Sequence, residues 1–273
     1  MQAVMSQAEP RKTMTQAQSS PIKRLEIRGS ESVKPIIQKI GYQYMTDFPS
    51  VELTLTMGRS VHGYKSVFQG TADIGMVASN MPDELHRKMH DKISEYKYTL
   101  IAHDAIAVIV HPSNPVKNLT QHDLKRIFSG RAKDWKEFGW HDGGKIDLYS
   151  PHPTHQAFAI WRSLVMGENS HVTIESKTLN SNKAITQSVE NNRQSIAYLS
   201  WVPAYTAGST IVRVDDHYPS SETISKKQYL LSQELRLFSK IDASDQVQKF
   251  LDYCVSQKTG QAIIKDMGWI SIG

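Results

Sequence analysis

The sequence contains a single cysteine, Cys254, among its 273 residues. One thiol cannot form an intrachain disulfide, and it excludes zinc-finger and iron–sulfur sites, which need several thiolates. No stretch approaches the ~18 consecutive apolar residues of a membrane-spanning helix, and the mean hydropathy is −0.43. Basic residues are scattered, without a block of five or six like charges, so the sequence gives no sign of a nucleic-acid-binding arm.

The N-terminal residues 1–21 also lack the apolar core of a secretory signal. They are polar and rich in Gln and Ser, which is typical of a disordered leader or a tag remnant. Either the protein stays in the cytoplasm or its export signal is not part of this chain, and composition leaves both possibilities open.

What is present points to a soluble α/β protein with about two domains, at ~150 residues per domain. Lys and Arg total 32 against 27 for Asp and Glu, and the net charge of +5 suits anionic partners. Apolar periodicity alternates between strand and helix from residue 23 onward, and the buried-strand pattern of residues 101–110 is long enough to cross between domains. We expect strands at 23–27, 51–55, 73–77, 145–149 and 195–199, helices at 33–44, 64–68, 154–166 and 181–189, a loop at 221–226, and two helices within 242–267.

Small hydroxyl residues follow two of the expected strands, in Gly29-Ser30-Glu31-Ser32 and in Gly58-Arg59-Ser60. A third turn of this kind is His152-Pro153-Thr154-His155. Helix N-termini present unpaired N–H groups and a partial positive charge, which suits an oxyanion. The alternative is that the serines only cap their helices, as serine often does.

Enzyme signatures are incomplete or missing. Residues 139–145 match the first part of a phosphate-binding loop, but Ile146 stands where a metal-binding Ser or Thr is required. The sequence has no G-x-S-x-G, H-E-x-x-H or G-x-G-x-x-G pattern. His152 and His155 have the spacing of a chelating pair, but no third ligand stands nearby. We therefore expect a binding protein rather than an enzyme, with no metal and no cofactor.

Several segments of the chain resemble the phosphate-binding solute receptors of ABC importers. The opening turn GSESVKP at 29–35 is similar to the Gly-Ser-x-Ser/Thr-Val-x-Pro turn of that family, and GTADIGM at 70–76 matches another of its stretches. Residues 104–115, DAIAVIVHPSNP, are similar to the segment between the lobes, and 118–120, 127–130, Trp135 and 196–200 continue the likeness. The resemblance covers residues 27–270.

The resemblance implies an α/β, two-lobed type II periplasmic-binding-protein fold, with a sheet flanked by helices in each lobe and a ligand cleft between the lobes. It places lobe 1 at residues 22–106 and 206–273 and lobe 2 at 107–205, with chain crossings near 106–110 and 200–205. It also implies a periplasmic or cell-envelope location, inorganic phosphate or a related oxyanion as ligand, the membrane subunits of an ABC importer as partners, and a monomer that binds no nucleic acid.

The ligand-binding residues carry over only in part. Ser32 falls at the hydroxyl position of the first turn, with Ser30 beside it and Glu31 able to offer its N–H. Ser60 matches the serine of a Gly-Ser-Gly turn but follows Arg59. Asn80 stands where the family has Asp or Arg. The second-lobe residues are Thr154 and His155.

The second lobe departs most from the family pattern, because residues 150–156, SPHPTHQ, replace Arg-x-x-Gly-Ser-Gly-Thr. Charge-assisted hydrogen bonds contribute ~1.5–3 kcal/mol each, so the change weakens a phosphate site of the family type. Our hypothesis is that Arg59 or a protonated His155 supplies the missing charge. Asp73 and Asp104 are candidates for the carboxylate that accepts a ligand proton in the family, although their strand-like segments favour structural roles.

Two other functions stay open beside an oxyanion receptor for transport or sensing. A protein-interaction or sensory module could have kept the fold and lost or changed its ligand, as the altered second-lobe turn suggests. A phosphate-ester hydrolase is disfavoured because no nucleophile–base pair or metal cluster is recognisable.

Overall fold

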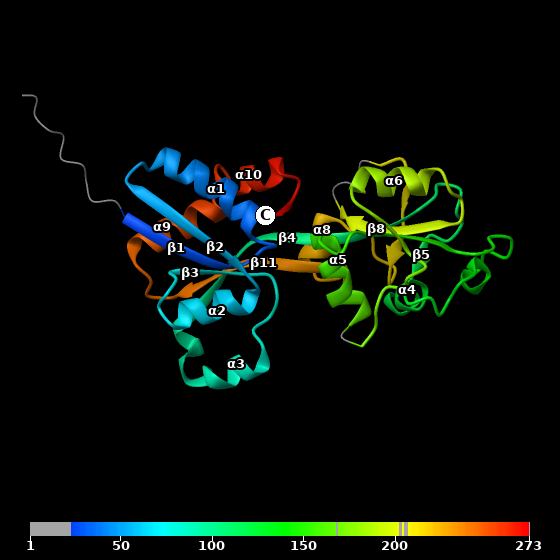
Figure 1. Ribbon diagram of the computed structural model, residues 1–273. Coiled ribbons are helices and arrows are strands. Elements are labelled where there is room, and N and C mark those ends of the chain that lie inside the picture. The colour runs from blue at the N-terminus through cyan, green and yellow to red at the C-terminus, as the bar shows by residue number, and fades with distance from the viewer. Residues whose placement is uncertain (1–22, 168, 202–203, 205–206, 273) are drawn as a thin grey trace, which may run out of the picture.

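The computed structural model describes residues 23–167, 169–201, 204 and 207–272. Two lobes lie side by side, joined by long strands (Figure 1). The predicted leader, residues 1–21, lies outside the described residues. No helix in the described part of the chain is long and apolar enough to cross a membrane.

The first lobe follows the predicted alternation of strands and helices. Its sheet has the order β2-β1-β3-β11, in which the first three strands are parallel and β11 is antiparallel. The elements are β1 Lys23–Ser30, α1 Lys34–Asp47, β2 Val51–Gly58, α2 Ser60–Phe68, β3 Ile74–Val77, α3 Asp83–Lys88, a 3-10 helix His90–Glu95, β11 Ser232–Lys240, α9 Asp245–Val255, α10 Gly260–Asp266 and β12 Ile270–Ser271.

Helix α2 packs unusually close to the sheet. A Cβ atom on Gly63 would lie 2.7 Å from the carbonyl oxygen of Met76, closer than real Cβ contacts allow. This approach brings the N-terminal end of α2 beside the residues that follow β3, where hydroxyl and amide side chains gather.

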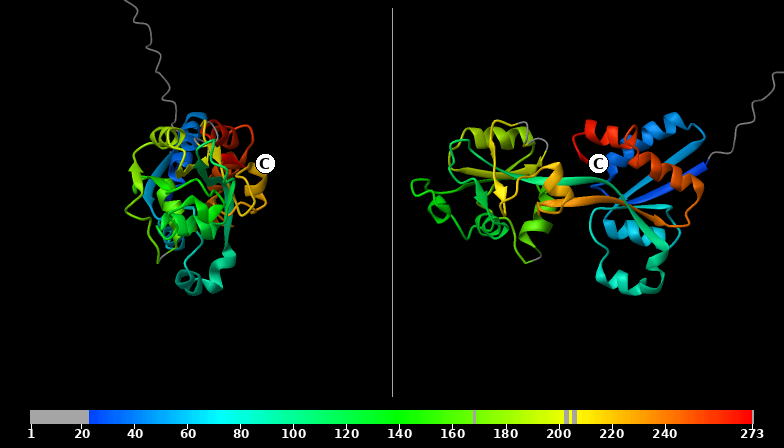
Figure 2. Two further views of the ribbon diagram at one scale, coloured as in Figure 1. Left: turned by 90° about the vertical axis from the view of Figure 1, so that its right-hand side faces the viewer. Right: turned by 180° about the vertical axis from the view of Figure 1, so that it is seen from behind.

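Strand β4, Tyr96–Val110, connects the lobes. Its first part pairs with β11, and from Ile106 onward it pairs with β8, Ser195–Ser200, in the second lobe. The change of partner falls at the predicted first crossing. The back view in Figure 2 shows β4 and β11 as the two strands that bridge the lobes.

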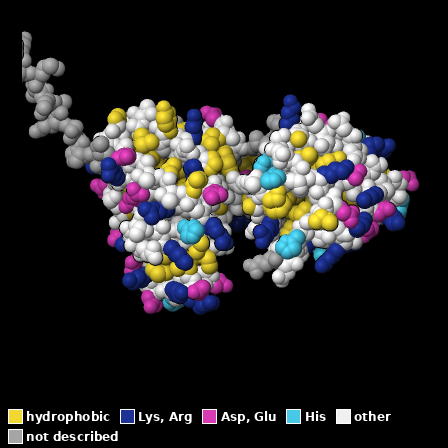
Figure 3. Space-filling view, in the orientation of Figure 1, with side chains coloured by type: hydrophobic (Ala, Val, Ile, Leu, Met, Phe, Trp, Pro, Cys, Tyr) yellow, Lys and Arg dark blue, Asp and Glu magenta, His cyan; other side chains and the backbone are white. Residues whose placement is uncertain are grey.

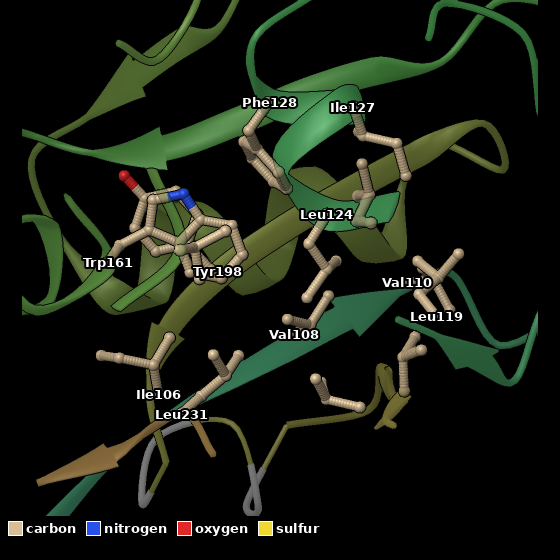
Figure 4. Packing of buried hydrophobic residues seen from close by; sticks show 14 of the residues in the cluster. Ile106, Val108, Val110, Leu119, Leu124, Ile127, Phe128, Trp161, Tyr198 and Leu231 are labelled. Carbon is tan, nitrogen blue, oxygen red and sulfur yellow. The ribbon is translucent and has the colours of Figure 1, made fainter. Parts of the chain in front are cut away.

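The return of the chain to the first lobe differs from expectation. The predicted crossing at 200–205 lies partly outside the described residues, but the segment beyond it still packs in the second lobe. Strand β9, Thr210–Ile211, pairs with β4, and the Ile106 N–H donates to the Leu231 carbonyl at 2.9 Å. Figure 4 shows Leu231 beside Ile106 in the same core. We therefore propose the boundary at 231–232 rather than at 206.

The expectation of a loop at 221–226 is wrong. Residues Ser221–Ser225 form the short helix α8, which Ser220 begins by accepting a hydrogen bond from the Thr223 N–H at 3.1 Å. Ile224 of this helix is buried in the second-lobe core. A local capping interaction and a buried apolar side chain therefore favour a helix in this segment.

The second lobe is built on a sheet of order β4-β8-β6-β7. In its core, Trp161 stacks on Tyr198 with the ring centroids 4.1 Å apart, and Phe128 meets both rings edge-on (Figure 4). The remaining elements are β5 Asn118–Leu119, α4 Gln121–Phe128, a 3-10 helix Trp135–Phe138, β6 Asp147–Pro151, α5 Gln156–Trp161, a π-helix Arg162–Met166, β7 Lys177–Leu179, α6 Asn182–Glu190 and β10 Arg213–Val214.

Candidate functional site

Two of the turns singled out in the sequence face each other across the space between the lobes. Glu31 and Ser32 from the first turn line a cavity of about 530 Å³ together with Thr154, His155 and Gln156 from the start of α5. We call this the turn cavity. Histidine and basic side chains lie on both sides of the gap between the lobes in the space-filling view (Figure 3). Four of the eight predicted ligand-binding residues, two from each lobe, therefore line one cavity.

The backbone amides of the first turn are already bonded within the protein. The Glu31 N–H donates to the Gly58 carbonyl at 3.1 Å, and the Ser32 N–H donates to the Ser30 hydroxyl at 3.2 Å. The Glu31 N–H, which we expected to face a ligand, therefore already has an acceptor in this structure. Helix α1 begins after Val33, without a side-chain cap from the described residues. The Ser32 side chain lines the turn cavity, whereas Ser30 Oγ already accepts the Ser32 N–H.

The second turn, Gly58-Arg59-Ser60, has a structural role. Ser60 is buried, and its Oγ accepts hydrogen bonds from the N–H groups of Ala78 at 3.0 Å and Ser79 at 3.3 Å. This hydroxyl ties the start of α2 to the chain that leaves β3. Arg59 is exposed, and its backbone N–H donates to His62 Nδ1 at 3.1 Å. Neither Arg59 nor Ser60 lines the turn cavity, so the structure does not bring these two predicted residues to it.

Asn80 lies in a different cavity. Its Oδ1 accepts a hydrogen bond from Arg236 Nη2 at 3.1 Å. Both residues line a space of about 410 Å³ between the end of β3, the bridging strand β11 and the π-helix of the second lobe. We call it the β11 cavity. The side-chain oxygen of Asn80, a predicted ligand-binding residue, therefore already accepts a hydrogen bond from within the protein.

The second-lobe turn has few free amides because of its two prolines. Pro151 and Pro153 have no N–H, and the His152 N–H donates to the Leu179 carbonyl at 3.0 Å. The N–H of Thr154 donates to His152 Nδ1 at 3.3 Å, and that of His155 donates to the His152 carbonyl at 2.8 Å. Every backbone N–H of residues 151–155 is therefore absent or bonded within the described chain, and the side chains of Thr154 and His155 are what this turn presents.

Gln156, which sequence reasoning did not select, links this turn to the crossing strand. Its Nε2 donates to Asp104 Oδ2 at 2.7 Å. Asp104 is 7% exposed, and burial raises the pKa of its carboxyl group to about 7, although the hydrogen bonds that it accepts act in the opposite direction. Asp73 has the structural role that its strand-like position favours, because its Oδ2 accepts the Glu26 N–H at 2.8 Å. No sequence pattern marks the pairing of Gln156 with Asp104, which are 52 residues apart.

The described residues contain no group of three or more His, Cys, Asp or Glu side chains arranged to hold a metal ion. The rings of His152 and His155 lie 6.4 Å apart between centroids, and Thr154 Oγ1 is 2.9 Å from His152 Nδ1. His152 Nδ1 therefore bonds to Thr154 within the turn.

Comparison with known proteins agrees with this architecture. A family model described as a PBP superfamily domain matches residues 14–258. The chain belongs to this superfamily. Among curated relatives, the phosphate-binding protein PstS of Staphylococcus haemolyticus is 27% identical over 256 residues, which cover 89% of this chain and 79% of the relative. The PstS of Staphylococcus epidermidis strain RP62A is equally similar over 256 residues.

Solved structures lead to the same fold. PstS from Borrelia burgdorferi superimposes with a TM-score of 0.81 at 23% identity and covers 92% of this chain and 99% of its own. A putative phosphate ABC transporter substrate-binding protein from Clostridium perfringens, solved with bound phosphate, is 27% identical with a TM-score of 0.62, over 92% of this chain and all of its own. The expected type II periplasmic-binding-protein fold is confirmed.

Proposed function

We propose that this PBP superfamily member binds inorganic phosphate or a similar oxyanion between its lobes, as the extracytoplasmic solute receptor of an ABC importer or of an associated sensor. The observation that carries the proposal is the turn cavity, where Ser32 of the first lobe meets Thr154 and His155 of the second. Ser32 and His155 can donate hydrogen bonds to an anion from opposite lobes, and the Glu31 carboxylate lines the same cavity. The names of the PstS relatives support phosphate as the ligand, and the function is binding by a monomer rather than catalysis.

Closure of the lobes completes the site. A buried anion has to replace its hydration with hydrogen bonds from the protein, and hydroxyls on opposite lobes do so only when the lobes approach each other. Because β4 and β11 both cross between the lobes, bending of these strands can bring the turns together without rearranging either sheet.

Calorimetric titration tests this proposal. Phosphate and sulfate are added to protein that has been unfolded, stripped of ligand and refolded. We expect a micromolar dissociation constant for phosphate, about −8 kcal/mol. The variant Ser32→Ala should bind about two- to tenfold more weakly, because a hydrogen bond contributes about 0.5–1.5 kcal/mol. The matched control is Ser50→Ala, an exposed serine just before β2, at the end of that strand away from Gly58.

A second function is favoured by one observation, the bonded or absent amides of residues 151–155. A turn without free N–H groups suits a fold retained for another ligand or for a protein partner. Binding of neither phosphate nor sulfate by the refolded parent protein would support that function and contradict the first.

A further inference from the structure

The β11 cavity contains cationic side chains, whereas the turn cavity is lined by the Glu31 carboxylate and by no Lys or Arg of the described residues. Arg236 and Lys227 line the β11 cavity, together with one carboxylate, Glu234. Lys227 Nζ lies 3.0 Å from Glu234 Oε1, and Arg236 Nη1 lies 3.6 Å from Glu234 Oε2. Two cations therefore share one carboxylate. His103 also lines the cavity, but burial lowers its pKa and favours its neutral form. The charged groups of the lining leave an excess of one positive charge.

Arg236 is held in place without using all of its donors. Its guanidinium lies 4.8 Å from the centroid of the Tyr98 ring, and Nη2 donates to Asn80 Oδ1 at 3.1 Å. The side chain is 15% exposed, and its Nε has no hydrogen-bond partner among the described residues. A guanidinium carries five N–H donors. An aromatic ring and an amide thus fix the orientation of a cation that retains donors for a ligand.

Arg236 lies where it can replace the positive charge that the second-lobe turn lacks. Arg236 stands on the bridging strand β11, and Ser163 and Leu164 of the second-lobe π-helix line the same cavity. Arg59, the sequence-based candidate for this charge, is exposed and lines neither the turn cavity nor the β11 cavity. Because Arg236 pairs with Val77 of β3 in the first-lobe sheet, its position relative to the first lobe stays fixed when the second lobe moves.

We propose that the β11 cavity is an oxyanion subsite in which Arg236 supplies the guanidinium, with the Asn80 side-chain N–H₂ and Lys227 as further donors. The Asn80 Nδ2 group remains available because only its Oδ1 accepts from Arg236. Ser163 adds a hydroxyl from the opposite lobe. Arginine suits an oxyanion because its planar fork matches two oxygens at once. This inference rests on the proposed function and adds a positively charged anion subsite to the contacts of the turn cavity.

Titration of phosphate into the parent protein and three variants tests the inference. We expect Arg236→Gln to weaken phosphate binding at least tenfold and Arg236→Lys to recover part of that loss, since lysine keeps the charge but not the fork. Arg131→Gln is the matched control, with the same chemical change at an exposed arginine that lines neither cavity, and should bind within twofold of the parent protein. Thermal unfolding of each variant shows whether it folds.

A second measurement, by NMR on the parent protein, is independent of whether Arg236→Gln folds. In the parent protein, the ¹⁵N resonance of Arg236 Nε, assigned by its absence from the Arg236→Lys spectrum, should shift as phosphate is added. Equal affinity of the parent protein and Arg236→Gln, or an unmoved resonance while the parent binds phosphate, overturns the inference and leaves the proposed function intact. A parent protein that binds no phosphate overturns both.

Discussion

The buried carboxyl group of Asp104, on the strand that crosses between the lobes, allows a quantitative test of how burial changes its pKa. Its carboxyl group is buried on β4, accepts a hydrogen bond from Gln156 and has its pKa raised from 3.8 to about 7 by burial. Because the folded protein holds this proton more tightly than the unfolded chain does, Asp104 contributes most to stability below about pH 4. The contribution is lost as the pH rises toward 7. Burial of this group therefore makes folding less favourable at neutral pH.

The size of the effect follows from the separation of the two pKa values, which is about three pH units. Each pH unit corresponds to ~1.36 kcal/mol, so ionised Asp104 reduces the free energy of unfolding by about 4 kcal/mol at pH 8 relative to pH 3. The variant Asp104→Asn is neutral at every pH and nearly isosteric, and its Oδ1 can still accept from Gln156. The stability difference between variant and parent protein should therefore increase by roughly that amount across this range.

Urea unfolding of both proteins at half-unit steps from pH 3 to pH 8 measures this difference. His103, whose pKa is lowered by burial, makes the parent protein less stable as the pH falls. That effect is present in both proteins and cancels in the difference. Asp142→Asn, at an exposed position, is the matched control. A difference between Asp104→Asn and the parent protein that stays constant from pH 3 to pH 8 would refute the reasoning.

Two further substitutions test the packing around the cleft. Ser60→Ala leaves two backbone N–H groups without their acceptor, and we expect urea unfolding to show a loss of about 1–3 kcal/mol; an unchanged unfolding midpoint would contradict the bridging role of this hydroxyl. Trp161→Ala removes the ring stacked on Tyr198 and should cost about 3–5 kcal/mol. A loss below ~1 kcal/mol in the same assay would mean that the second-lobe core does not depend on this pair.

Local patterns predicted most of the first lobe, because alternation and helical spacing are properties of short segments. Strand β1, helix α1 and strand β2 lie at the predicted positions with longer ends. The return of the chain was harder to predict. Strand β11 has alternating buried residues, Leu235 and Leu237, but its partner β4 is more than 120 residues away in the sequence. Pairing over such a separation is not visible in any local window.

The candidate site, too, could be predicted from local patterns only in part. Sequence reasoning found Ser32, Thr154 and His155, which do line one cavity, because hydroxyls after strands are a local signal. It could not show that two of the turn amides are already bonded, since the acceptors of these two come from distant parts of the chain. Gly58 accepts from Glu31, and Leu179 accepts from His152.

The placement of positive charge shows why a binding site can persist when a family motif is lost. A search for the family pattern looks for an arginine in the second-lobe turn, and this sequence has none at residues 150–156. An anion requires only that a cation face it, and Coulomb attraction does not depend on which element supplies the charge. In the proposed subsite the guanidinium comes from β11, where Arg236 is held by Tyr98 and Asn80. Loss of a motif residue therefore predicts loss of binding only if no other cation lines the cleft, and here Arg236 and Lys227 do.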